Sequence, residues 1–171
     1  MNNIIFLDIQ GVLNTREYFI KTYEYRKKIT KLLDHTNPND IAKLHLAKID
    51  INRINMLKEA CDITEAKIVI TSDIKLLEVY PYIEKKLISK GLPIIGCTPN
   101  ISTDKRGEEI RAYLKENKVD NYVILDDDVF EDFNELINNL VKTSFYNDEG
   151  LTEESCKKII KKLTPNNQEN N

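Results

Sequence analysis

Two short apolar runs in this chain end directly in carboxylates, which can act as nucleophiles and as ligands of hard metal ions. The first run, Ile4–Leu7, ends at Asp8, and the second, at 122–125, ends at Asp126 and Asp127. Adjacent acids repel one another, so burying them at a strand end is costly unless a cation neutralises them. Mg²⁺ is a hard ion that takes oxygen ligands and needs few carboxylates. The acids therefore predict a magnesium site.

A third apolar run, which begins at Ala66, ends in two hydroxyl side chains, Thr71 and Ser72. Short runs of this kind are typical of buried strands in a parallel sheet. Ligands of open α/β sheets bind at the carboxyl ends of the strands, which is where Asp8 and Thr71 are predicted to lie. The competing interpretation is purely structural, with Asp8 ending a strand and Ser72 or Asp73 capping the next helix.

Strands and helices are predicted to alternate along the chain. This alternation predicts an α/β fold with three layers and a Rossmann-like parallel sheet, in which right-handed crossovers bring Asp8, Thr71 and Asp127 to one edge. The predicted strands lie at about 4–7, 66–72, 122–125 and 140–145, with a short strand and turn at 94–99. The predicted helices lie at about 16–33, 50–61, 76–90, from 105 onward, 129–140 and 153–163.

The length of 171 residues suits one domain, predicted over 1–164, with an insertion at about 15–49 after the first strand. The insertion is rich in aromatic and charged side chains, and Asn37 to Asp40 is predicted to break it because Asn, Asp and Pro favour turns. A solvated surface helix is one interpretation of its first part. The polar tail 165–171 is predicted to be disordered.

Bulk properties exclude several classes of protein. The formal net charge is −3, so no strong basic field is available for nonspecific binding to nucleic acid. The three cysteines are far apart in the sequence, which predicts neither a disulfide framework nor a zinc site. No leader peptide or stretch of membrane-spanning length is present, so no membrane association and a cytoplasmic location are expected; secretion without a signal would leave no trace in the sequence.

The stretch Asp8-Ile9-Gln10-Gly11-Val12-Leu13-Asn14 resembles the first motif of haloacid dehalogenase-like (HAD) phosphohydrolases. It is most similar to a small HAD group that includes domains of RNA-repair assemblies. The resemblance implies that Asp8 attacks phosphorus to form an aspartyl-phosphate, and that an insertion after the first strand serves as a cap over the site. It also implies a bound Mg²⁺, held by Asp8 and the backbone carbonyl of Gln10.

The other motifs of the family have counterparts in the same order. Thr71, with Ser72 beside it, matches the hydroxyl that bonds a phosphoryl oxygen, and Asp126 and Asp127 match the acids on the metal side, one directly and one through water. The resemblance also implies substrate contacts from Gly11, Ser72 and Lys75.

The basic third motif has two candidates, because either Lys105 or Arg106 could supply the cation that holds the nucleophile and the phosphoryl oxygens together. The sequence does not choose between them. Alternating charges on an exposed helix are the structural alternative for this stretch. The triple acid ends at Asp128, which is predicted to cap a helix at 129–140.

Gln10 is the main departure from the family, since most of these phosphatases have a second aspartate there. Gln10 can donate a hydrogen bond but has no proton to give at neutral pH. The leading hypothesis is a phosphohydrolase or phosphotransferase that acts on a phosphorylated small molecule, a nucleotide or a nucleic-acid end. The alternatives are a catalytically impaired HAD domain that binds phosphorylated ligands, and a non-enzymatic module that binds a protein partner through the insertion 15–49.

Overall fold

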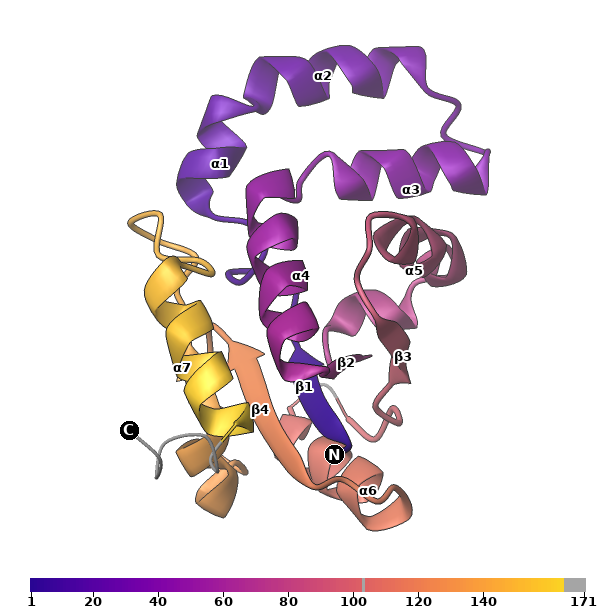
Figure 1. Cartoon of the computed structure of the whole chain (residues 1–171). Helices are drawn as coiled ribbons and strands as arrows, with labels where there is room; N and C mark the ends of the chain where they lie inside the picture. Colours follow the sequence, from indigo (N-terminus) through magenta and orange to yellow (C-terminus); the bar gives the residue numbers. More distant parts are fainter. Residues whose placement is uncertain (103, 165–171) are drawn as a thin grey trace.

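The structure is a computed structural model that describes residues 1–102 and 104–164. Its centre is a five-stranded sheet in the order β3-β2-β1-β4-β5 (Figure 1). Every neighbouring pair of strands is parallel, so the predicted α/β fold with a parallel sheet is confirmed. The strands are β1 (Asn3–Leu7), β2 (Lys67–Ile70), β3 (Ile94–Cys97), β4 (Asn121–Asp126) and β5 (Leu140–Lys142).

The register of the sheet brings the ends of its three central strands level. Leu7, the last residue of β1, pairs with Ile70 on one side and with Leu125 on the other. The ladder continues one residue further, because Asp8 N–H donates to the carbonyl of Leu125 and Thr71 N–H donates to that of Leu7, both at 2.9 Å. The chain continues from β1 to β2 and β3 on one side, and then crosses to β4 on the other side of β1. α/β sheets bind ligands at such a point, where the strand order reverses.

Helices cover both faces of the sheet and bury alternate residues of its strands. Ile5 and Leu7 of β1 belong to the larger core, whereas Ile4 and Phe6 point into a smaller one on the opposite face. The larger core is built with α4 (Ile51–Thr64), α5 (Tyr80–Ser89) and α7 (Glu153–Leu163). The smaller core is built with α6 (Arg106–Glu116) and the 3₁₀ helix η2 (Asn134–Asn139). These are the three layers that the alternation of elements predicts.

The insertion after β1 folds into three helices, α1 (Arg16–Lys21), α2 (Tyr23–Leu32) and α3 (Pro38–Leu46). The single helix predicted at 16–33 is interrupted at Thr22, whose hydroxyl donates to the carbonyl of Tyr18 at 2.7 Å. Asn37 caps α3 by accepting from Asn39 N–H, and Pro38 occupies the first turn, as expected for a helix start. We refer to residues 15–49 as the cap.

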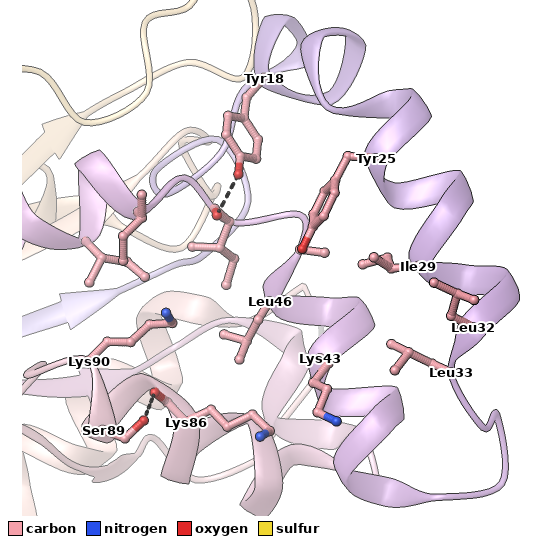
Figure 2. Close-up of a pocket in the computed structure, with 14 residues that line it drawn as sticks. Tyr18, Tyr25, Ile29, Leu32, Leu33, Lys43, Leu46, Lys86, Ser89 and Lys90 are labelled. Atoms are coloured by element: carbon pink, nitrogen blue, oxygen red, sulfur yellow. Dashed lines mark hydrogen bonds between the residues drawn. The ribbon is translucent and has the colours of Figure 1, made fainter.

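A groove of about 530 Å³ lies between α2 of the cap and the helices α3, α4 and α5 (Figure 2). Apolar side chains project from α2 toward α3, although α2 has no buried residue. Tyr18 donates a hydrogen bond to the carbonyl of Ile49 at 3.1 Å and ties the two ends of the cap together. The α2 side chains that line the groove are Tyr25, Ile29 and Leu32, with Leu33 directly after the helix, and the lysines that line it are Lys43, Lys86 and Lys90.

The prediction of an α-helix at 129–140 is wrong, because only the 3₁₀ helix η2 forms there, after a turn. Asn134 has a left-handed φ of 43°, which an α-helix does not accommodate. Asp132 packs so closely on α6 that a Cβ added to Gly107 would lie 2.4 Å from its carbonyl oxygen. Asp128 therefore caps no such helix, and its carboxylate accepts from Val129 N–H instead.

The helix predicted at 76–90 begins later, at Tyr80, after a short 3₁₀ helix η1 (Asp73–Leu76). The predicted disordered tail 165–171 lies outside the described residues. Among the helices of the described ranges, none is both long and apolar enough to cross a bilayer.

Candidate active site

Three carboxylates meet at the carboxyl edge of the sheet, beyond β1 and β4. Asp8, Asp126 and Asp127 each offer one oxygen, and these oxygens lie within 4.8 Å of one another. Asp8 is 6% exposed and Asp126 is 2% exposed, while Asp127 is half-buried. The prediction that separate strand ends bring these acids together agrees with this arrangement.

Arg106, the first residue of α6, binds this cluster from the side. Its Nη1 donates to Asp8 Oδ1 at 3.1 Å, to Thr71 Oγ1 at 3.2 Å and to Asp126 Oδ2 at 3.3 Å. The guanidinium also lies over the ring of Phe130, 4.9 Å from its centroid, and Arg106 is only 5% exposed. One buried cation thus bridges the ends of β1, β2 and β4.

One guanidinium does not balance three carboxylates. Burial raises the pKa of Asp8, and the nearby guanidinium of Arg106 opposes that shift. Burial, followed by repulsion from Asp8, raises the pKa of Asp126 to about 7. The same two causes raise the pKa of Asp127. The ionised cluster is therefore undercompensated by the protein, and an added cation would stabilise it.

The donor set fits a magnesium ion. Carboxylate oxygens are hard ligands, and three of them within 4.8 Å can share one ion. Asp8, Asp126 and Asp127 are the residues that would hold the ion, with the backbone carbonyl of Gln10 as the further predicted ligand. The close approach of these three carboxylates, two of them almost fully buried, is the observation that supports this fit.

Gly11 allows the loop after β1 to approach the acids of β4. Its φ is +69°, a conformation that side chains disfavour, and an added Cβ would lie 2.1 Å from Asp127 Oδ2. Its N–H donates to Asn14 Oδ1 at 3.0 Å, which closes the turn. The structure thus gives Gly11 a clear role in letting Asp127 reach the cluster, whereas its predicted contact with substrate stays a prediction.

The structure separates the two candidates for the basic motif. Arg106 is inserted into the cluster, whereas Lys105 is half-exposed and pairs at 3.3 Å with Glu108 on the surface of α6. Ser72 lies beside Asp8 and, by hydrogen bonding, lowers the pKa of that carboxyl. The geometry therefore favours Arg106, with Ser72 next to the nucleophile candidate.

Lys75 does not reach the acid cluster. Its side chain is 3% exposed and forms a buried ion pair with Glu109, and its ammonium also donates to Thr98 Oγ1 at 2.8 Å. The predicted contact of Lys75 with a substrate anion is not supported by this geometry, because the ammonium is already bonded inside the protein.

Gln10 is exposed and faces a pocket of about 380 Å³ between the loops after β1 and β2 and the cap. The cap contributes Phe19, His45 and Lys48 to this pocket, and the sheet side contributes Ser72 among others. Gln10 and Ser72, which lies beside Asp8, line the same pocket.

Three side chains of the site were not predicted. Phe130 covers the guanidinium of Arg106, Asn14 closes the turn at Gly11, and Glu109 fixes Lys75. Only Glu109 has a sequence signal, because it lies one helical turn after Arg106 and therefore on the same side of α6. Phe130 belongs to the stretch for which a helix was predicted.

Comparison with known proteins gives one match. A sequence profile described as the HAD domain in Swiss Army Knife RNA repair proteins matches residues 4–156. No curated protein and no solved structure matches the chain. The matched range contains all the residues of the acid cluster, Arg106 and the cap.

Proposed function

The chain belongs to this family of HAD domains, and on that premise we propose that it is a Mg²⁺-dependent phosphohydrolase or phosphotransferase with Asp8 as its nucleophile. The observation that carries the proposal is the convergence of Asp8, Thr71, Arg106 and the acids of β4 at one edge of the sheet. These side chains come from four separate segments of the chain.

In the proposed reaction an oxygen of Asp8 attacks phosphorus, forming a P–O bond while the bond to the leaving group breaks with its electron pair. Water then attacks phosphorus, and the P–O bond to Asp8 breaks with its electron pair, which restores the carboxylate. The protons of the water leave with the released phosphate or pass to solvent. Arg106 and Thr71 donate hydrogen bonds to the phosphoryl oxygens and hold the nucleophile in line. A magnesium ion on Asp8, Asp126 and Asp127 would neutralise the charge that develops on those oxygens.

Gln10 sets the kind of leaving group that the site handles best. It can donate a hydrogen bond to the departing oxygen but cannot transfer a proton to it. Loss of positioned acid–base help usually costs ~10²–10⁴-fold in rate. We therefore propose that substrates whose leaving group needs little protonation, such as a phosphate from an anhydride or a carboxylate from an acyl phosphate, are turned over faster than esters of alcohols.

The cap supports a phosphorylated nucleotide or nucleic-acid end as the substrate class. Residues 15–49 contain eight Lys and Arg against four Asp and Glu, although the whole chain has a net charge of −3. This positive segment lines the pocket at Gln10 with Phe19, His45 and Lys48. A basic cap beside an acidic, metal-binding centre suits an anionic substrate that reaches the metal with only one of its phosphates.

The test is a panel of phosphate esters and anhydrides, assayed with Mg²⁺ for the natural chain and for Gln10→Asp. We expect Gln10→Asp to raise kcat for alkyl phosphates by about tenfold or more, with a smaller gain for acetyl phosphate. Gln10→Asn, which is equally unable to donate a proton, is the matched control and should give no gain. Equal gains on all leaving groups would contradict an acid–base role at this position.

Gln10 also favours a second candidate, a catalytically impaired domain that binds phosphorylated ligands. Beryllofluoride with Mg²⁺ mimics a phosphorylated aspartate and should raise the unfolding temperature in either case. Binding without turnover of any substrate, in both the natural chain and Gln10→Asp, would favour the binding domain. Absence of both binding and turnover would argue against both candidates.

A further inference from the structure

The start of α6 is held on the β3 side by a buried ion pair outside the acid cluster. Lys75 of η1 and Glu109 of α6 are 3% and 4% exposed and form a salt bridge. The Glu109 carboxylate also accepts from Thr98 Oγ1 at 3.0 Å and from Ile101 N–H at 3.1 Å. One carboxylate therefore joins η1, the end of β3 and the loop that follows it to α6.

The ion pair is connected to two candidate site residues. Glu109 leads to Arg106 along α6, and Thr98 leads to Thr71 along the sheet. Glu109 lies one turn after Arg106 on the same helix, so fixing Glu109 fixes the backbone from which the guanidinium extends. Thr98 N–H donates at 2.9 Å to the carbonyl of Ile70, the residue before Thr71. Arg106 Nη1 donates to Thr71 Oγ1 at 3.2 Å, so these contacts form a closed ring.

The opposite side of the same helical turn is held by a different contact. Asp132 accepts at 2.8 Å from Glu108 N–H, and its carbonyl packs against Gly107. The first turn of α6 is thus fixed from both sides of the helix. Such restraint is needed because Arg106 reaches three acceptors that come from three strands, and a small rotation of α6 would break those bonds.

Stability alone does not explain the ion pair. Two buried charges lose their hydration, and replacing such a pair by uncharged groups of similar size is often neutral or stabilising. A buried ion pair does fix direction, because each charge must face the other. The geometry of this pair therefore suits orientation better than it suits stabilisation.

We propose that Lys75 and Glu109 are positioning residues: their ion pair sets the first turn of α6 so that Arg106 stays on Asp8, Thr71 and Asp126. Its consequence for turnover rests on the function proposed above, whereas the orientation of Arg106 can be measured without any activity. Lys75 thereby serves the site through Arg106 rather than by binding the substrate.

The test is the double variant Lys75→Met/Glu109→Gln, which removes both charges and keeps the side-chain shapes and the acceptor for Ile101 N–H. The matched control is Lys158→Met/Glu154→Gln, the same substitutions in an exposed pair at 2.7 Å on α7. We expect both variants to fold, as judged by unfolding temperature and circular dichroism. Only the first should affect the site.

The first measurement is the NMR spectrum of the arginine side chains, with the Arg106 signals assigned from their loss in Arg106→Ala. In the natural chain and in the control, the Arg106 Nη protons should give separate, slowly exchanging signals. In Lys75→Met/Glu109→Gln they should average and exchange faster. Unchanged Arg106 signals would overturn the proposal, whether or not the protein has phosphatase activity.

The second measurement is a kinetic cycle with Arg106→Ala. The Lys75/Glu109 change should lower kcat/KM by about 10- to 100-fold in the natural chain and have no further effect once Arg106 is alanine. An equal loss in both backgrounds, or no loss while the Arg106 signals average, would overturn the positioning role. A natural chain without turnover on any substrate would refute the proposed function and leave the NMR result to decide the orientation of Arg106.

Discussion

The acid cluster and the cap are built in opposite ways. At the cluster, Asp8, Asp126 and Arg106 are almost fully buried, and Arg106 alone makes three hydrogen bonds to residues at the ends of three strands. In the cap, apolar side chains line an open groove, and Leu32 of α2 is 72% exposed (Figure 2). The polar groups of the cluster are therefore tightly bonded, whereas the apolar side chains of the cap are loosely packed.

This difference teaches how the fold divides its tasks. Groups that must meet one phosphorus atom benefit from fixed geometry, and strand ends supply it. A cap that admits and releases ligand benefits from low local stability, which follows from few buried contacts. Changes at the cluster should therefore alter chemistry strongly, and changes in the cap should alter stability only weakly.

The largest effect is expected for Asp8→Asn, which keeps the shape of the side chain but removes the nucleophile. Turnover should fall by about 10⁴-fold or more, and the rise in unfolding temperature with beryllofluoride and Mg²⁺ should disappear. Asp40→Asn, in the first turn of α3 and outside the acid cluster, is the control and should retain both. A retained beryllofluoride shift in Asp8→Asn would remove Asp8 from the nucleophile role.

The second effect is on stability as a function of pH. The pKa of Asp126 is raised from 3.8 to about 7 in the folded protein, so the folded state binds its proton more tightly than the unfolded state does. Stability that is present below about pH 4 is then lost as the pH rises toward about 7, by on the order of a few kcal/mol.

Thermal unfolding between pH 4 and 8, in EDTA and in Mg²⁺, tests this dependence. We expect the unfolding temperature in EDTA to fall more steeply for the natural chain than for Asp126→Asn, and Mg²⁺ to reduce the difference at pH 7. Identical slopes for the two proteins in EDTA would show that the cluster is not undercompensated.

The sequence predicts the cluster well because its signals are local. An apolar run that ends in an acid locates a strand and its terminal carboxylate together, as at Asp8 and Asp126. The choice between Lys105 and Arg106 needs the rotation of α6 relative to the sheet, which neighbouring residues do not determine. The pair of Lys75 with Glu109 joins positions 34 residues apart, so no local pattern reveals it.

The cap and the stretch after β4 are less predictable for related reasons. The position of the insertion predicts a cap. The shape of the groove, however, depends on the orientation of α2 relative to α3, and α2 has no buried residue that would fix this orientation. The α-helix expected at 129–140 does not form, because the Asp132 carboxylate accepts a hydrogen bond from α6 and Asn134 adopts a left-handed backbone conformation. Tertiary contacts override local helix propensity there.

A third and smaller effect is expected for Gly11→Ala, which tests how tightly the edge of the acid cluster is packed in comparison with the cap. The new Cβ would meet Asp127 and occupy a left-handed conformation, so we expect a destabilisation of about 1–3 kcal/mol and weaker Mg²⁺ binding. Urea unfolding and a magnesium titration measure these changes. Gly96→Ala, whose Cβ meets nothing within 4 Å despite its positive φ, separates the backbone strain from the clash.

The smallest effect is expected in the cap. Leu32→Ala should change the free energy of unfolding by less than about 0.5 kcal/mol, because its side chain remains largely in water. Leu57→Ala on α4 removes the same atoms from a site with 0% exposure and should cost about 2–5 kcal/mol. Urea unfolding of the two variants compares cap and core directly, and hydrogen exchange should show α2 opening well before α4. Equal losses for the two leucines would mean that α2 is packed in solution as firmly as the core, and the contrast between a rigid cluster and a loose cap would then fail.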